Sequence, residues 1–276
     1  MALVSFDLDG VLQRNPFHGS KPHGVFGHIK RTLAAHVGLA DPVAAADAAL
    51  AMVFAEHQAR LHNGRLVGAH DWDGIVATVI SRLGYPGTIS VTDLVVEYCG
   101  KPDMIFLYPG GRECLQALAG AGHTLVTITN GFRCYQEPVL RALGVLDLFS
   151  AMITPEAVGA AKPQPEIFRA AEAYGPGPCF HIGDTLPHDV AGAKRSGWKA
   201  IYIVQPLAPG YSEMPPELAA LPPWERPARG AEWLRTRLEI DRQWHGFPPV
   251  TAEECVPDAV VTNLSEIPQT IAALLG

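Results

Sequence analysis

The chain has 276 residues, of which 48% are hydrophobic, and its formal net charge at pH 7 is −7. This composition predicts a folded protein of one large or two smaller domains and argues against a disordered chain. The net negative charge and the lack of a long basic run argue against a nucleic-acid partner. The most apolar later segment, residues 44–55, is interrupted by Asp47 and is too short to cross a bilayer, so no membrane partner is expected.

The cysteines and the N-terminal residues indicate the compartment. The five cysteines are scattered without a C-x-x-C pair, so neither a disulfide framework nor a zinc site is indicated. The N-terminus enters an apolar run directly, without the basic region and long apolar stretch of a signal peptide. A reducing, cytoplasmic location is therefore expected.

The first predicted strand covers the apolar run from Leu3 and ends in Asp7-Leu8-Asp9-Gly10. A continuous apolar run is typical of a buried parallel strand, and ligands bind beyond the carboxyl ends of such strands. Residues two apart on an extended chain point the same way, so Asp7 and Asp9 are expected to face one site. The same residues are also common in turns, which is the alternative interpretation.

Residues 14–104 are expected to be mostly helical. The segment 13–30 is rich in Pro, Gly, His and Lys and is predicted to be a loop. Asp41-Pro42 starts a helix that Asn63-Gly64 ends, and two more helical patterns cover residues 72–83 and 93–99. A second D-x-D-G at residues 71–74 precedes a helical pattern, so Asp71 or Asp73 is interpreted as a helix N-cap.

Strands and helices alternate from residue 105 onward, which predicts βαβ units and a parallel sheet. The alternation resumes at residues 105–110, and strand patterns follow at 124–129, 151–154, 179–182, 200–204 and 259–261. Helical patterns cover residues 112–119, 137–143, 165–173 and 190–196, and a last helix ends at Leu275. A proline-rich excursion at 205–257 interrupts this pattern, with a helix expected at 231–244. Its three tryptophans indicate an appendage packed on the core, and a lid or subunit contact is the alternative.

Polar side chains follow three of the predicted strands, at positions that converge on one edge of a doubly wound sheet. They are Asp7 and Asp9, then Thr129 and Asn130, then Asp184 and Asp189, with Lys162 at a loop-to-helix junction. An aspartate there can attack phosphorus and form an aspartyl-phosphate if its charge is offset. Mg²⁺ held by Asp7 and Asp184 would offset the charge, while a lysine and hydroxyl or backbone donors hold the phosphoryl oxygens. His181, inside a strand, is interpreted as a hydrogen-bonded core histidine.

These residues resemble, in order, the four motifs of the haloacid dehalogenase-like (HAD) superfamily. The motifs are Asp7-Leu8-Asp9-Gly10, Thr129-Asn130-Gly131, Lys162-Pro163, and Gly183-Asp184 followed by Asp189. The resemblance implies a Rossmann-like α/β core in which Asp7 is the nucleophile and Asp9 protonates the leaving oxygen and then activates water. It also implies that Thr129 and the Asn130 amide bind phosphate and that Lys162 neutralises charge. Mg²⁺ would be held by Asp7, the Asp9 carbonyl and Asp184. Asp189 would be either a further ligand or a residue that contacts a ligand without binding the metal.

The helical insert after the first motif resembles the C1 cap of this superfamily. The expected domains are therefore a catalytic core of residues 1–13 and 105–276 and a cap of residues 14–104. Superfamily members that dehalogenate or cleave phosphonates lack an acid at the position of Asp9, so a phosphatase acting on a small phosphorylated metabolite is predicted. A phosphomutase shares the same motifs, and a non-catalytic phosphate-binding protein is the third possibility. Neither the substrate nor the oligomeric state follows from the sequence.

Overall fold

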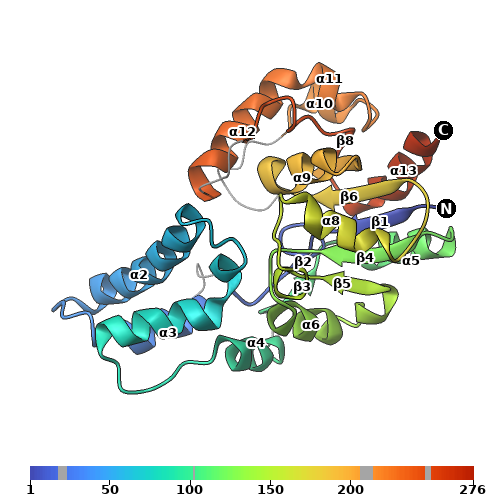
Figure 1. Ribbon diagram of the computed structural model, residues 1–276. Coiled ribbons are helices and arrows are strands. Elements are labelled where there is room, and N and C mark those ends of the chain that lie inside the picture. The colour runs from blue at the N-terminus through green and yellow to red at the C-terminus, as the bar shows by residue number, and fades with distance from the viewer. Residues whose placement is uncertain (18–23, 102, 206–213, 246–249) are drawn as a thin grey trace. The chain divides into compact units, whose positions relative to one another are not determined.

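The computed structural model describes residues 1–17, 24–101, 103–205, 214–245 and 250–276, without the side chains of residues 243–245. Its contacts divide the chain into two compact units (Figure 1). The first unit comprises Met1–Arg14, Leu107–Asn130 and Val145–Gly276. The second comprises Asn15–Phe106 and Gly131–Gly144.

A six-stranded parallel sheet forms the centre of the first unit, with the strand order β5-β4-β1-β6-β7-β8. The strands are β1 (Leu3–Phe6), β4 (Thr124–Ile128), β5 (Ala151–Ile153), β6 (Cys179–Gly183), β7 (Lys199–Ile203) and β8 (Ala259–Val261). The change of direction in strand order at β1 is typical of a doubly wound sheet. The predicted α/β fold class is thus confirmed, and the strand pattern at 259–261 is found as the edge strand β8.

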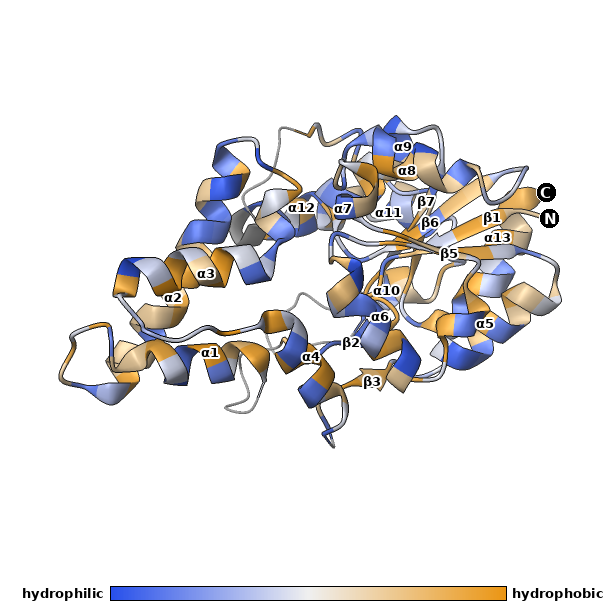
Figure 2. Cartoon of the chain, turned by 60° about the horizontal axis from the view of Figure 1, so that its bottom comes forward, coloured by the Kyte–Doolittle hydropathy of each residue, from blue (hydrophilic) through white to orange (hydrophobic). Residues whose placement is uncertain are grey.

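Burial on both faces explains why the strands read as apolar runs. All four residues of β1 are buried, and Leu3, Val4 and Phe6 have no exposed surface. Full burial of such a side chain stabilises the folded state by about 1.5–3 kcal/mol. Helices α8 (Pro165–Glu172) and α9 (Ala191–Arg195) cover one face and α5 (Gly111–Gly120) the other, as Figure 2 shows around the mostly orange strands.

The remaining elements of the first unit are short apart from α12 (Ala231–His245) and α13 (Ile267–Leu275). They are η2 (Leu146–Leu148), α7 (Pro155–Val158), the π-helical turn η3 (Leu186–Val190), α10 (Pro216–Ala219), α11 (Arg226–Arg229) and η4 (Leu264–Glu266). The helix expected at 231–244 is confirmed as α12, while residues 206–213 and 246–249 of the same excursion lie outside the described residues. No helix among the described residues combines the length and the apolar character needed to cross a bilayer.

Two expectations about local structure are wrong. Residues 105–110 contribute only β3 (Phe106–Leu107), which pairs with β2 (Gln13–Arg14) in a separate two-stranded sheet. The segment 13–30 is not all loop, because α1 (Val25–Ala34) begins inside it. Val25, Ile29 and Leu33 recur every fourth residue and are buried, a helical spacing that the interspersed Gly, His and Lys concealed. Residues 18–23 lie outside the described part of the chain.

The second unit is helical. It contains α1, α2 (Pro42–His62), η1 (Gly68–His70), α3 (Trp72–Leu83), α4 (Val91–Cys99) and α6 (Arg133–Ala142). Asp41 caps α2 and Asp71 caps α3, as the sequence predicted. Asp73 caps a different helix: its carboxylate accepts hydrogen bonds from the Val91 and Thr92 amides at the start of α4 and from the Tyr135 hydroxyl.

Candidate active site

The sheet register brings the polar groups together. Phe6 is paired with Thr127 on β4 and with Ile182 on β6, so all three strands end at nearly the same level. Asp7 follows β1, Thr129 and Asn130 follow β4, and Asp184 follows β6. Parallel strands present their carboxyl ends on one edge, and this edge therefore collects side chains from segments far apart in the sequence.

Lys162 is the cation of this site. Its side chain is 2% exposed, and Nζ lies 3.0 Å from Asp7 Oδ2 and 2.6 Å from Asp189 Oδ1. Burial alone would lower the pKa of Lys162, but the two carboxylates raise it above its usual value, so the ammonium stays charged. Lys162 can therefore neutralise part of any negative charge that forms at Asp7.

The side chain of Asn130 fixes the backbone of Lys162. Asn130 Oδ1 accepts a hydrogen bond from the Lys162 amide at 2.8 Å, and Asn130 Nδ2 donates to the Lys162 carbonyl oxygen at 3.3 Å. Thr129 is 2% exposed, and its amide donates to the Ile153 carbonyl oxygen at 3.3 Å. The side chain that follows β4 thus binds both backbone polar groups of Lys162.

Asp189 makes hydrogen bonds through both of its carboxylate oxygens. Lys162 Nζ and His181 Nε2 lie 2.6 and 3.0 Å from its Oδ1, while the Thr185 amide and hydroxyl donate to its Oδ2 at 2.9 and 2.6 Å. Burial acts to raise the pKa of Asp189, but Lys162 and His181 lower it well below its usual value. The carboxylate is therefore ionised and held in one orientation.

His181 is hydrogen-bonded inside the core, as the sequence indicated. Its Nδ1 lies 2.7 Å from Ser5 Oγ, and its Nε2 faces Asp189. Burial lowers the pKa of His181, which favours a neutral ring that donates through Nε2 and accepts through Nδ1. Its contact with Asp189 makes it part of the site, a role that the sequence did not reveal. The only signal was its position two residues before Gly183 in β6.

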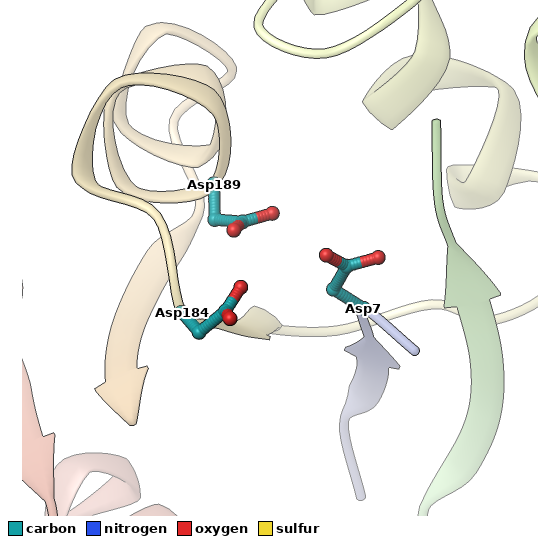
Figure 3. Close-up of side chains that lie close together, drawn as sticks. All are labelled: Asp7, Asp184 and Asp189. Carbon is teal, nitrogen blue, oxygen red and sulfur yellow. The ribbon is translucent and has the colours of Figure 1, made fainter. Parts of the chain in front are cut away.

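Asp7, Asp184 and Asp189 form a group that could hold a metal ion. One oxygen from each lies within 4.8 Å of the other two, and Figure 3 shows the three carboxylates converging from β1, the end of β6 and the following helical turn. Burial raises the pKa of Asp7 to about 6, although Lys162 opposes the shift. Burial, with Asp189 and Asp7 nearby, also raises the pKa of Asp184 well above its usual value.

Glycines allow this close approach. Gly10 has a φ of +82°, and a Cβ on it would lie 2.1 Å from Asp184 Oδ2. A Cβ on Gly183 would lie 2.2 Å from the Cβ of Asp189. Asp9, just before Gly10, is half-buried, and its Oδ1 accepts a hydrogen bond of 3.5 Å from Gln13 Nε2. Its side chain is not one of the three carboxylates that cluster among the described residues.

A family model described as haloacid dehalogenase-like hydrolase matches residues 1–197. The chain belongs to the haloacid dehalogenase-like hydrolases. The resemblance inferred from the four motifs is thus confirmed, and all four lie within the matched residues.

Relatives within the superfamily include a phosphoserine phosphatase from Thermus thermophilus, 33% identical over 115 residues, which are 41% of this chain and 46% of that protein. The chain spans about half the length of the curated relatives it matches. The crystal structure of a HAD phosphatase from Thermococcus onnurineus matches with a TM-score of 0.58 and 26% identity, covering 77% of this chain and 90% of that one.

A 2-haloacid dehalogenase from Pseudomonas syringae matches equally well in fold, with a TM-score of 0.58 at 19% identity over 99% of both chains. The fold of this HAD-like hydrolase is therefore common to phosphatases and dehalogenases. The fold alone does not distinguish the two activities, which differ in the side chains that they need in the site, above all at the position of Asp9.

Proposed function

We propose that this chain is a Mg²⁺-dependent phosphatase that hydrolyses a small phosphomonoester through an aspartyl-phosphate on Asp7. The observation that carries the proposal is the convergence of three carboxylates and Lys162 on one edge of the sheet. With all three carboxylates ionised, the site would carry a formal excess of two negative charges over Lys162, which one divalent cation would balance. Carboxylate oxygens are also the ligands that Mg²⁺ prefers.

Asp7 and Asp184 would hold the ion, together with the Asp9 carbonyl, and Asp189 would lie beside it. When bound, Mg²⁺ would offset the charge on the attacking carboxylate and on the phosphoryl oxygens. Since Asp189 already accepts from Lys162, His181 and Thr185, we assign it mainly to orienting the lysine.

In the first chemical step, an Asp7 carboxylate oxygen forms a bond to phosphorus while the phosphorus–oxygen bond to the leaving alcohol breaks. Asp9, as the acid, gives its proton to the departing oxygen. In the second step, Asp9 takes a proton from water, the water oxygen bonds to phosphorus, and the Asp7–phosphorus bond breaks to release inorganic phosphate. An acid two residues after the nucleophile is needed for both steps, which is why Asp9 favours a phosphatase over a dehalogenase.

The other residues hold the phosphoryl group. Lys162 would neutralise charge on its oxygens, and the Thr129 hydroxyl and Asn130 amide would donate to them. The side chain of Asn130 is already bonded to the Lys162 backbone, so we assign it to positioning the lysine. The name of the phosphoserine phosphatase relative supports a small phosphorylated metabolite as substrate.

The test is a panel of sugar, nucleotide and small-acid phosphates assayed for phosphate release with Mg²⁺. Asp7→Asn should abolish release, whereas Asp147→Asn, at an exposed aspartate of the same unit, should leave it unchanged. Equal release by Asp7→Asn and wild type would contradict the mechanism. Transfer of phosphate between positions without net release would identify a phosphomutase instead. If neither Mg²⁺ nor vanadate raises the melting temperature, the result would favour a non-catalytic protein over a phosphatase.

A further inference from the structure

Helix α12 comes from the Pro- and Trp-rich excursion and lies beyond residues 1–197, which the family model matches. One face of it is buried in the first unit. Leu234 and Leu238 are 5% and 3% exposed, and the charged residues Arg237 and Asp241 on the same face are 2% and 3% exposed. Buried charged groups are rare unless they are paired, so the partners of these two side chains carry information.

The partner of Asp241 lies between Asp184 and Asp189, two residues of the proposed metal site. Asp241 Oδ2 accepts a hydrogen bond of 2.9 Å from the Leu186 amide, across 55 residues of sequence. Leu186 is the first residue of the π-helical turn η3, between Asp184 and Asp189. Arg237 Nε donates to the Tyr202 hydroxyl at 3.1 Å and so fixes α12 against β7.

The rest of this turn is held by its own residues. The Asp189 and Val190 amides donate to the Thr185 carbonyl oxygen at 3.0 and 3.3 Å, and Thr185 donates to the Asp189 carboxylate. The first amides of a helical turn have no acceptor within the turn itself. Asp241 supplies that acceptor for Leu186 from a separate helix.

We propose that Asp241 is a positioning residue for the metal site: by binding the Leu186 amide it fixes the turn that sets Asp184 and Asp189 relative to each other. This inference rests on the proposed Mg²⁺-dependent function. Residues that orient metal ligands from behind typically change metal affinity about 10–100-fold when removed. The effect acts through a hydrogen bond to a backbone amide, so an uncharged acceptor of the same shape should replace the carboxylate.

The experiment compares Asp241→Asn, Asp241→Ala and the matched control Glu232→Ala, an exposed acid on the same helix. Mg²⁺ binding to the metal-free protein is measured by calorimetry without substrate, and phosphate release is measured against Mg²⁺ concentration. Asp241→Ala should weaken Mg²⁺ binding about tenfold or more, while Asp241→Asn stays within about twofold of wild type. Glu232→Ala should match wild type.

Unchanged Mg²⁺ binding in Asp241→Ala would overturn the inference alone. Equal weakening in Asp241→Asn would also overturn it, because the charge and not the hydrogen bond would then matter. A wild-type protein that binds no Mg²⁺ would overturn the proposed function and this inference together. If Asp241→Ala does not fold, hydrogen exchange on wild type decides: the Leu186 amide should be protected, and free exchange would contradict the proposal.

Discussion

Gly10→Ala, compared with a control glycine variant, should show a loss of Mg²⁺ binding that the loss of fold stability does not explain. A Cβ at this position would lie 2.1 Å from Asp184 Oδ2 and 3.1 Å from Asp184 Cγ. Real Cβ contacts essentially never fall below 3.0 Å, so the carboxylate has to move by about 1 Å. A displacement of about 1 Å in a catalytic arrangement can reduce the rate about 10²-fold. We therefore expect about a 10²-fold loss of phosphate release together with weaker Mg²⁺ binding.

The matched control is Gly122→Ala. Gly122 has a φ of +81°, nearly the value at Gly10, and a Cβ on it would meet nothing within 4 Å. The left-handed backbone costs a non-glycine residue about 1–2 kcal/mol in either place. Chemical unfolding of the metal-free proteins should show a loss of about that size for both variants, and Mg²⁺ titration should show a defect for Gly10→Ala alone. Equal Mg²⁺ affinity and activity in the two variants would refute the reasoning.

Other substitutions test separate parts of the account. Lys162→Met removes the buried cation between Asp7 and Asp189 and should destabilise the metal-free protein by about 3–5 kcal/mol in chemical unfolding, whereas no measurable change would show that the pair is not buried. Asp73→Ala removes the acceptor at the start of α4 and should cost about 1–3 kcal/mol while Mg²⁺ affinity stays at the wild-type value. Burial lowers the pKa of His57 below 6.5, so the unfolded chain binds more protons there as the pH falls. His57 therefore has no effect on the free energy of unfolding above pH 6.5 and lowers it below that pH. In His57→Gln, the fall in melting temperature between about pH 7 and about pH 5 should be smaller than in wild type. An equal fall in the two proteins would contradict this.

The core of the fold could be predicted because its strands are buried on both faces. A buried parallel strand such as Leu3–Phe6 leaves a continuous apolar run in the sequence, and the polar residues that follow mark its carboxyl end. Helix α1 was missed because burying one helical face requires only every third or fourth residue to be apolar, and the residues between them looked like loop. Within the described ranges, the short strand β3 pairs with β2 alone, an arrangement that the six-residue pattern at 105–110 could not show.

Most residues of the candidate site could also be predicted from the sequence. Asp7, Lys162 and Asp184 stand at motif positions, and the structure brings them to one edge with Asp189. The contact between His181 and Asp189 depends on which face of β6 the ring occupies, and that face is set by the packing of the sheet.

Asp241 could not be predicted at all. It belongs to a segment without a recognisable motif, and it reaches Leu186 only because α12 packs against η3 within the first unit. Contacts of this kind depend on tertiary packing and leave no local pattern in the sequence.

The most direct test of the central claim is to trap the covalent intermediate. Borohydride reduces an aspartyl-phosphate to homoserine, which peptide mass spectrometry can locate. When the protein is trapped while it hydrolyses a phosphomonoester substrate in the presence of Mg²⁺, we expect homoserine at residue 7. The Asp7→Asn protein should contain none. Phosphate release without homoserine at residue 7, or with homoserine at another aspartate, would contradict the assignment of Asp7 as the nucleophile.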